Sequence, residues 1–219
     1  MKKVIVSLFC TAALYFAADA SAQSFDFSNI QFWIGTGTNQ AALVIDWKDG
    51  KTPESLAWGY RWNGSATGFD MLQAVDAADS RLHVFIYQPW GNFVYGMGYD
   101  LNGNGGTFTP GTPGVSEGGS ISDPADHYRE GAYTGFWGYD IGTGNPYNGG
   151  SWSASNVGAD TRSLTNGSWD GWSFSTDETT FTVPDPSSPT SAVPEPSSLC
   201  LVALGLAGLV ACRKKFRRS

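Results

Sequence analysis

The sequence predicts an α+β domain made mostly of antiparallel β-structure, with one amphipathic helix packed across a sheet. Short aromatic and β-branched runs recur between Phe25 and Thr182, and Asn-Gly or Asp-Gly dipeptides typical of tight turns separate them. One segment, 67–79, departs from this pattern and places apolar residues at helical spacing. A lone amphipathic helix must bury its apolar face, and a half-polar sheet is the available surface.

Nine runs have the length and composition of strands. They are residues 30–34, 42–47, 55–62, 82–88, 93–98, 107–109, 135–139, 150–155 and 171–175. The helix is expected over residues 69–78, with Thr67 as its N-cap and the Asp70 carboxylate reaching back to the Thr67 amide. The expected buried face consists of Met71, Leu72, Val75 and Ala78.

The N-terminus has the three parts of a secretory signal peptide. Lys2 and Lys3 supply positive charge, an apolar stretch covers residues 4–18, and a small-x-small site ends at Ala22. We therefore expect export through the Sec translocon and cleavage after Ala22. Residues 1–22 are the predicted signal peptide, and residues 23–181 are the predicted exported domain.

The C-terminus has the composition of a spacer followed by a membrane anchor. Residues 182–198 are rich in proline and serine and predict an extended spacer. Residues 199–212 hold only Leu, Val, Ala, Gly and Cys, and residues 213–219 form a basic tail. This order places the tail in the cytoplasm and the domain outside. Fourteen residues give a helix of roughly 21 Å, short of the ~30 Å hydrocarbon core, which favours a transient anchor.

The tail resembles the PEP-CTERM sorting signal in all three of its parts. The motif is Val193-Pro194-Glu195-Pro196, and the apolar run and the basic end follow it in order. This resemblance implies recognition by an exosortase in a Gram-negative bacterium, with cleavage near the motif. The implied route leads from an inner-membrane intermediate to the cell surface or extracellular matrix. Such a tail is an address and implies no activity.

The exported region is more loosely similar to bacterial surface modules related to the C-terminal domain of transcobalamin. The similarity lies in the order of the helix at 69–78, an aromatic strand at 90–97, a Trp-x-Tyr strand at 135–139 and a closing strand at 164–174. It implies a β-grasp-like core. A Val-Asn-Gly turn is missing and residues 102–126 form an insertion, so cobalamin binding does not carry over.

Cysteine and charge exclude several classes of function. Cys10, Cys200 and Cys212 all lie outside the predicted exported domain, which excludes a disulfide scaffold, a zinc–cysteine site or a thiol enzyme there. Residues 23–192 contain six Lys and Arg against 18 Asp and Glu, a net charge near −12. Such a surface disfavours nucleic-acid binding, which depends on neutralising phosphates.

Alternating aromatics in one strand are the first candidate binding site. Trp58, Tyr60 and Trp62 must point to one face of a sheet. Exposed, they would stack on sugar rings of an exopolysaccharide; buried, they would fill a core that contains few Leu and Ile.

A glycine-rich segment is a candidate calcium loop. Asp100, Asn102 and Asn104 stand at positions 1, 3 and 5 of such a loop, and Gly105 stands at position 6. Position 12 is Gly111 rather than the usual bidentate glutamate. The alternative is a hairpin turn whose polar side chains cap the backbone. No other cofactor is expected.

Three functions stay open from sequence. The first is a non-catalytic surface or matrix module. The second is a carbohydrate- or small-ligand-binding module that uses exposed Trp and Tyr. The third is a secreted hydrolase, for which Asp126 and His127 would supply acid–base groups. A solvated loop with local ion pairs over residues 123–130 is the alternative to that site, and a turn is the alternative to a carboxylate pair at Asp46 and Asp49.

Overall fold

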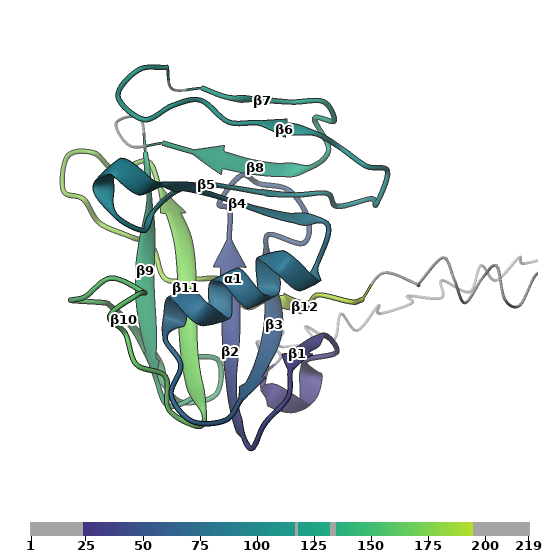
Figure 1. The fold of residues 1–219 in the computed structure, drawn as a ribbon, viewed down its shortest axis with the longest axis vertical. Helices are drawn as coiled ribbons and strands as arrows, with labels where there is room; N and C mark the ends of the chain where they lie inside the picture. The colour runs from purple at the N-terminus through teal and green to yellow at the C-terminus, as the bar shows by residue number, and fades with distance from the viewer. Residues whose placement is uncertain (1–23, 117, 132–134, 195–219) are drawn as a thin grey trace, which may run out of the picture.

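The computed structural model describes residues 24–116, 118–131 and 135–194, which form a main sheet, a smaller sheet and one α-helix (Figure 1). The main sheet has the order β1 (Trp33–Gly35), β3 (Ser55–Trp62), β2 (Asn39–Asp46), β11 (Ser168–Ser175), β9 (Phe136–Thr143) and β10 (Ser151–Ala154), and β12 (Thr190–Ser191) also pairs with β3. The smaller sheet has the order β4 (Leu82–Tyr87), β5 (Phe93–Tyr99) and β8 (His127–Glu130), and β6 (Phe108–Thr109) pairs with β7 (Ser120–Ile121).

The predicted mostly-β architecture with one α-helix is confirmed in the part of the chain that the structure describes. Strand pairing is mixed, because β1 and β12 run parallel to β3, and β11 runs parallel to β2. The β2–β3, β9–β11, β9–β10, β4–β5 and β5–β8 pairs are antiparallel.

Helix α1 (Gly68–Ala78) begins at its predicted cap. The Asp70 amide donates to Thr67 Oγ1 at 3.1 Å, and the Thr67 amide donates to the Asp70 carboxylate at 2.8 Å, so two otherwise unsatisfied N–H groups find partners. Met71, Leu72 and Val75 are fully buried as predicted, whereas Ala78, the fourth residue of the predicted buried face, is exposed. The helix lies across one face of the main sheet (Figure 1).

Alternation along the central strands divides the side chains of the main sheet between two faces. Leu43 and Ile45 of β2 pack on the helix side, whereas Ala42 and Val44 belong to a separate cluster on the other side. The helix-side cluster extends under the smaller sheet, where Met97 is fully buried. One core therefore joins the helix and both sheets.

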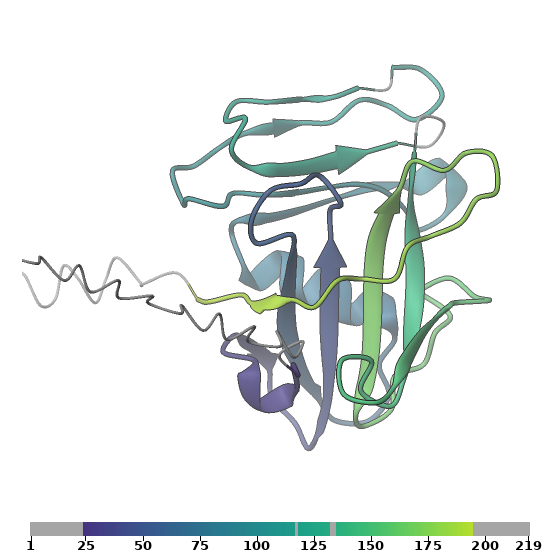
Figure 2. The same cartoon turned by 180° about the vertical axis from the view of Figure 1, so that it is seen from behind.

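The second face of the main sheet is covered in part by the N-terminal segment with the short 3₁₀ helix η1 (Phe27–Asn29), whose Phe27 ring stacks on Trp169 at 4.9 Å, and in part by an extended chain. Residues 182–192, here called the strap, cross that face from β9 to the far edge of β3 (Figure 2). Pro186 lies over Gly171, where an added Cβ would meet its Cγ at 2.7 Å. The Ser187 amide donates to the buried Asp46 carboxylate at 2.7 Å.

The strap corrects the predicted boundary of the spacer. The sequence predicts that the exported domain ends at residue 181 and that an extended spacer begins at residue 182, but Pro186, Pro189 and Ala192 are buried and the Ala192 amide donates to the Ala57 carbonyl at 2.9 Å. Proline has no main-chain N–H group, but this does not weaken the packing of the strap, because most of the strap crosses the sheet as extended chain and forms few main-chain hydrogen bonds. The folded domain thus continues to the first residues of the sorting motif.

Strand β8 occupies residues 127–130 of the segment 123–130, for which a solvated loop was one of the two sequence interpretations. The Arg129 guanidinium turns inward and donates to the carbonyls of Trp47 at 3.2 Å and Lys48 at 2.9 Å. Trp47 and Lys48 lie about 80 residues before Arg129 in the sequence, so no local sequence pattern predicts strand β8.

Candidate functional site

The predicted aromatic row lies inside the protein. Trp58, Tyr60 and Trp62 do share one face of β3, but that face meets helix α1 and the core; the exposed fractions of Trp58 and Trp62 are 0% and 5%. Trp58 Nε1 donates to the Asp79 carboxylate at 3.0 Å. The prediction of a ligand platform at these residues is therefore wrong, because a sheet has two faces and alternation alone does not tell which one is covered.

A different row of aromatic side chains reaches the surface, on the smaller sheet. We call it the aromatic surface, and it consists of Phe85, Tyr87, Trp90, Phe93 and Tyr95. Trp90, at the end of the short 3₁₀ helix η2 (Gln88–Trp90), is 49% exposed, and the other four are half-buried. Val84 and Ile86 of β4 and Val94 of β5 point the other way, into the core.

The rings of the aromatic surface support one another. The centroids of Tyr87 and Trp90 lie 5.1 Å apart in an edge-to-face arrangement, and those of Trp90 and Phe93 lie 5.4 Å apart. Tyr95 continues the row, 6.4 Å from Tyr87 and 6.3 Å from Phe85. Contacts of this kind hold aromatic rings in place, which leaves a rigid apolar surface for stacking.

Hydrogen-bonding side chains lie beside the exposed tryptophan. Gln88 Nε2 donates to the Asn92 side-chain carbonyl at 3.4 Å, and Asn92 Nδ2 donates to the Asp160 carboxylate at 3.3 Å. At the other end, burial and then the nearby Glu130 carboxylate raise the pKa of Tyr95 above its ordinary value. The charged groups beside the row are thus acidic.

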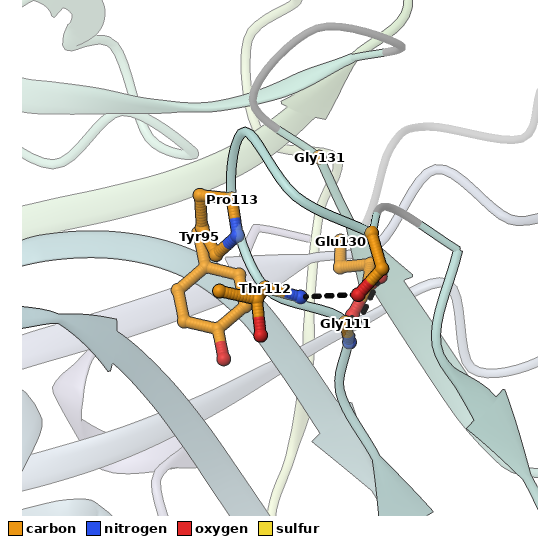
Figure 3. A pocket seen from close by; sticks show the side chains of 7 residues that line it. Tyr95, Gly111, Thr112, Pro113, Glu130 and Gly131 are labelled. Atoms are coloured by element: carbon orange, nitrogen blue, oxygen red, sulfur yellow. Dashed lines mark hydrogen bonds between the residues drawn. The ribbon is translucent and has the colours of Figure 1, made fainter.

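The rest of this sheet face is covered by the β6–β7 hairpin. The Phe108 ring lies over Gly98, where an added Cβ would meet it at 2.5 Å, and it stacks on Tyr128 at 5.9 Å. Glu130 accepts the main-chain N–H group of Gly111 at 2.9 Å (Figure 3). It also accepts the main-chain N–H group of Gly118 at 2.7 Å. The crevice beside these bonds is too narrow for a water molecule, so it is not a ligand site. Glu130 instead holds the β6–β7 hairpin against the smaller sheet.

The candidate calcium loop folds around its first residue. The buried Asp100 carboxylate accepts N–H groups from Gly103 at 2.7 Å and from Gly105 at 2.8 Å, as a turn would require. Asn102 and Asn104 are exposed, and their Nδ2 groups both donate to Asp123 Oδ2, at 2.9 and 2.7 Å. The loop therefore faces Asp123 and Asp126, and Asp126 is a residue that the sequence assigned to a separate candidate site.

The contacts of His127 indicate a structural role. The ring is fully buried, its Nδ1 lies 3.0 Å from the Asp49 carboxylate, and its Nε2 lies 2.8 Å from the Pro53 carbonyl. Both neighbours are hydrogen-bond acceptors that engage the two ring nitrogens, and the ring stacks on Trp47 at 4.5 Å. Burial opposes ionisation of Asp49, but the hydrogen bond and charge of His127 hold its pKa below the ordinary value. No ring nitrogen is free to move a substrate proton, so the geometry does not support acid–base chemistry by His127.

The strap leads directly into the sorting motif. Val193 is 44% exposed, and its carbonyl accepts a hydrogen bond from the Arg81 guanidinium. Pro194 is exposed, while Glu195, Pro196, the apolar run and the predicted signal peptide lie outside the described residues. Within the described ranges, no helix is long and apolar enough to cross a membrane.

Comparison with known proteins bears on the tail alone. Neither the curated proteins nor the solved structures contain a match to this chain. The profile of the PEP-CTERM protein-sorting motif matches residues 192–218, the segment that the sequence analysis identified. The chain therefore carries a PEP-CTERM protein-sorting motif, which supports export, processing by an exosortase and sorting to the bacterial envelope or surface.

Proposed function

We propose that the chain is a non-catalytic module of the cell surface or extracellular matrix, and that its exported domain binds carbohydrate at the aromatic surface. The proposed route passes through the Sec translocon and an inner-membrane intermediate of a Gram-negative bacterium, before exosortase cleavage. The β-grasp-like core and the similarity to transcobalamin-related modules stay predictions.

The exposed indole of Trp90 carries the carbohydrate proposal. Sugar rings present C–H faces that stack on aromatic rings and hydroxyl edges that bond to amides and carboxylates. The aromatic surface offers both kinds of contact, because Tyr87, Trp90 and Phe93 lie beside Gln88 and Asn92. Since Asp160 and Glu130 add negative charge nearby, the expected ligand is a neutral exopolysaccharide rather than an acidic one.

Affinity electrophoresis through gels containing a neutral or an acidic polysaccharide tests the proposal. We expect a neutral glucan to retard the protein and Trp90→Ala to weaken that retardation about tenfold, since one lost stacking contact removes about 1.4 kcal/mol. Val157→Ala is the matched control, because Val157 is also exposed, at 45%, and lies outside the aromatic surface. Retardation that is equal in the Trp90→Ala variant would refute this site, and the absence of retardation by every glucan would refute the ligand class.

A further inference from the structure

A buried carboxylate oxygen next to the glycine-rich loop lacks a hydrogen-bond donor. Asp126 is fully buried; its Oδ1 accepts the Leu101 amide at 3.0 Å, but its Oδ2 has no hydrogen-bond partner within the described residues. An isolated buried carboxylate oxygen is unfavourable unless a donor or a cation satisfies it. This oxygen therefore indicates a missing positive partner.

The oxygen points into the loop at 100–106. A Cβ added at Gly106 would lie 2.1 Å from Asp126 Oδ2 and 3.7 Å from Asn104 Oδ1. The absence of a side chain at Gly106 thus lets the unsatisfied Asp126 oxygen approach the loop main chain, on the side of the loop where the Asn104 amide oxygen lies.

Asp123 adds a second carboxylate to the same place. Its Oδ2 lies 2.7 Å from Asn104 Nδ2. Lys51 is the neighbouring cation, but its Nζ pairs with Asp49 at 3.5 Å and donates to the Asp126 main-chain carbonyl, so the side-chain Oδ2 keeps no donor.

The available donors are all oxygens, which restricts the ion. No group of three His, Cys, Asp or Glu side chains in the described part of the chain is placed to hold a metal by itself. An ion here must complete its shell with amide oxygens, main-chain carbonyls and water. Calcium accepts such mixed, irregular oxygen shells, whereas zinc takes nitrogen and sulfur and magnesium demands a near-ideal octahedron.

We propose that the loop at 100–106 and the turn at 123–126 together bind one Ca²⁺ ion, with Asp126 Oδ2, the Asp123 carboxylate and the Asn104 amide oxygen as ligands. Asp100 shapes the loop by accepting its amides and is a positioning residue. The ion would tie the loop that follows β5 to the turn that precedes β8, across the insertion that contains β6 and β7.

Calcium titration of the full chain in detergent, by calorimetry and thermal unfolding, tests this proposal. We expect saturable binding with a dissociation constant of roughly 10⁻⁴ to 10⁻³ M, the range of extracellular calcium modules, and an unfolding temperature that rises with calcium and falls again with chelator. Asp126→Asn should weaken binding at least tenfold. Glu178→Gln, which changes an exposed acidic residue of another loop, should bind as the wild type does.

A second variant keeps the test decisive if Asp126→Asn does not fold. Asp123 is half-exposed, so Asp123→Asn should fold and should also lose at least tenfold in affinity. Three results would each overturn the proposal. They are wild-type affinity in Asp123→Asn or Asp126→Asn, an equal response to magnesium, and the absence of saturable binding heat up to about 10 mM calcium. This concentration is about ten times the largest dissociation constant that we expect.

Discussion

Asp140, on the strap side of β9, gives a sharp test of the packing described above. Its side chain is 3% exposed and its Oδ2 has no hydrogen-bond partner within the described residues. Burial, and then the negative charge of Asp185 in the strap, raise the pKa of Asp140 from 3.8 to about 6. The folded state therefore holds a proton on Asp140 at pH values where the unfolded chain has lost it.

The sign and size of the effect follow by linkage. The contribution of Asp140 favours folding fully below pH 4 and is lost as the pH rises through 6. The difference between the two pKa values corresponds to about 3 kcal/mol in the free energy of unfolding. Asp140→Asn removes the charge at every pH, so the variant should gain about 3 kcal/mol relative to wild type between pH 4 and pH 8.

Urea denaturation of both proteins across that pH range measures the gain. The unpartnered amide introduced by the substitution has an energetic cost of its own, but that cost does not change with pH, and other titrating groups cancel in the comparison. A difference between variant and wild type that stays flat from pH 4 to pH 8 would show that Asp140 ionises in the folded state as freely as in water, which contradicts its burial beneath the strap.

Three further substitutions test the core, the strap and the helix cap. Trp58→Phe removes the indole N–H that bonds to Asp79, and urea denaturation should show a loss of about 1–3 kcal/mol; unchanged stability would argue against the buried bond. Gly138→Ala places a Cβ 2.2 Å from Val183 Cγ2 and should lower the free energy of unfolding by about 1–3 kcal/mol. In a Val183→Gly background the same substitution should lower it clearly less, and equal losses in both backgrounds would mean that the strap does not pack on the sheet. Thr67→Ala should lose about 1 kcal/mol through the cap of α1, and a loss near zero would count against the capping box.

Local chemistry made the helix and most strands predictable. The capping box and the apolar spacing after it are properties of a dozen consecutive residues, and α1 begins within one residue of the predicted position. Strand β3 has the predicted bounds because a turn dipeptide ends it and aromatic alternation runs through it. Alternation also predicted that Trp58 and Trp62 share a face, but which face the helix covers is decided by distant parts of the chain.

The strap and β8 could not be predicted because their partners are distant in sequence. The strap fits a track of small residues on the main sheet, where Pro186 meets Gly171 and Val183 meets Gly138, and a proline-rich segment carries no sign of that track. The aromatic surface could have been predicted more easily than the strap. His83, Phe85 and Tyr87 alternate with core residues along β4, so the alternation argument that we used for β3 would also have identified these residues.

Mass spectrometry of the protein recovered from cells with and without an exosortase tests the central claim, that the tail sorts an exported domain. With the enzyme present, the account predicts a chain that starts at Gln23, lacks the apolar and basic end, and lies outside the inner membrane. Without the enzyme, the same N-terminus should carry the whole tail and remain in the inner membrane. An uncut chain from Met1 to Ser219 in the cytosol of cells that contain the exosortase would contradict the account.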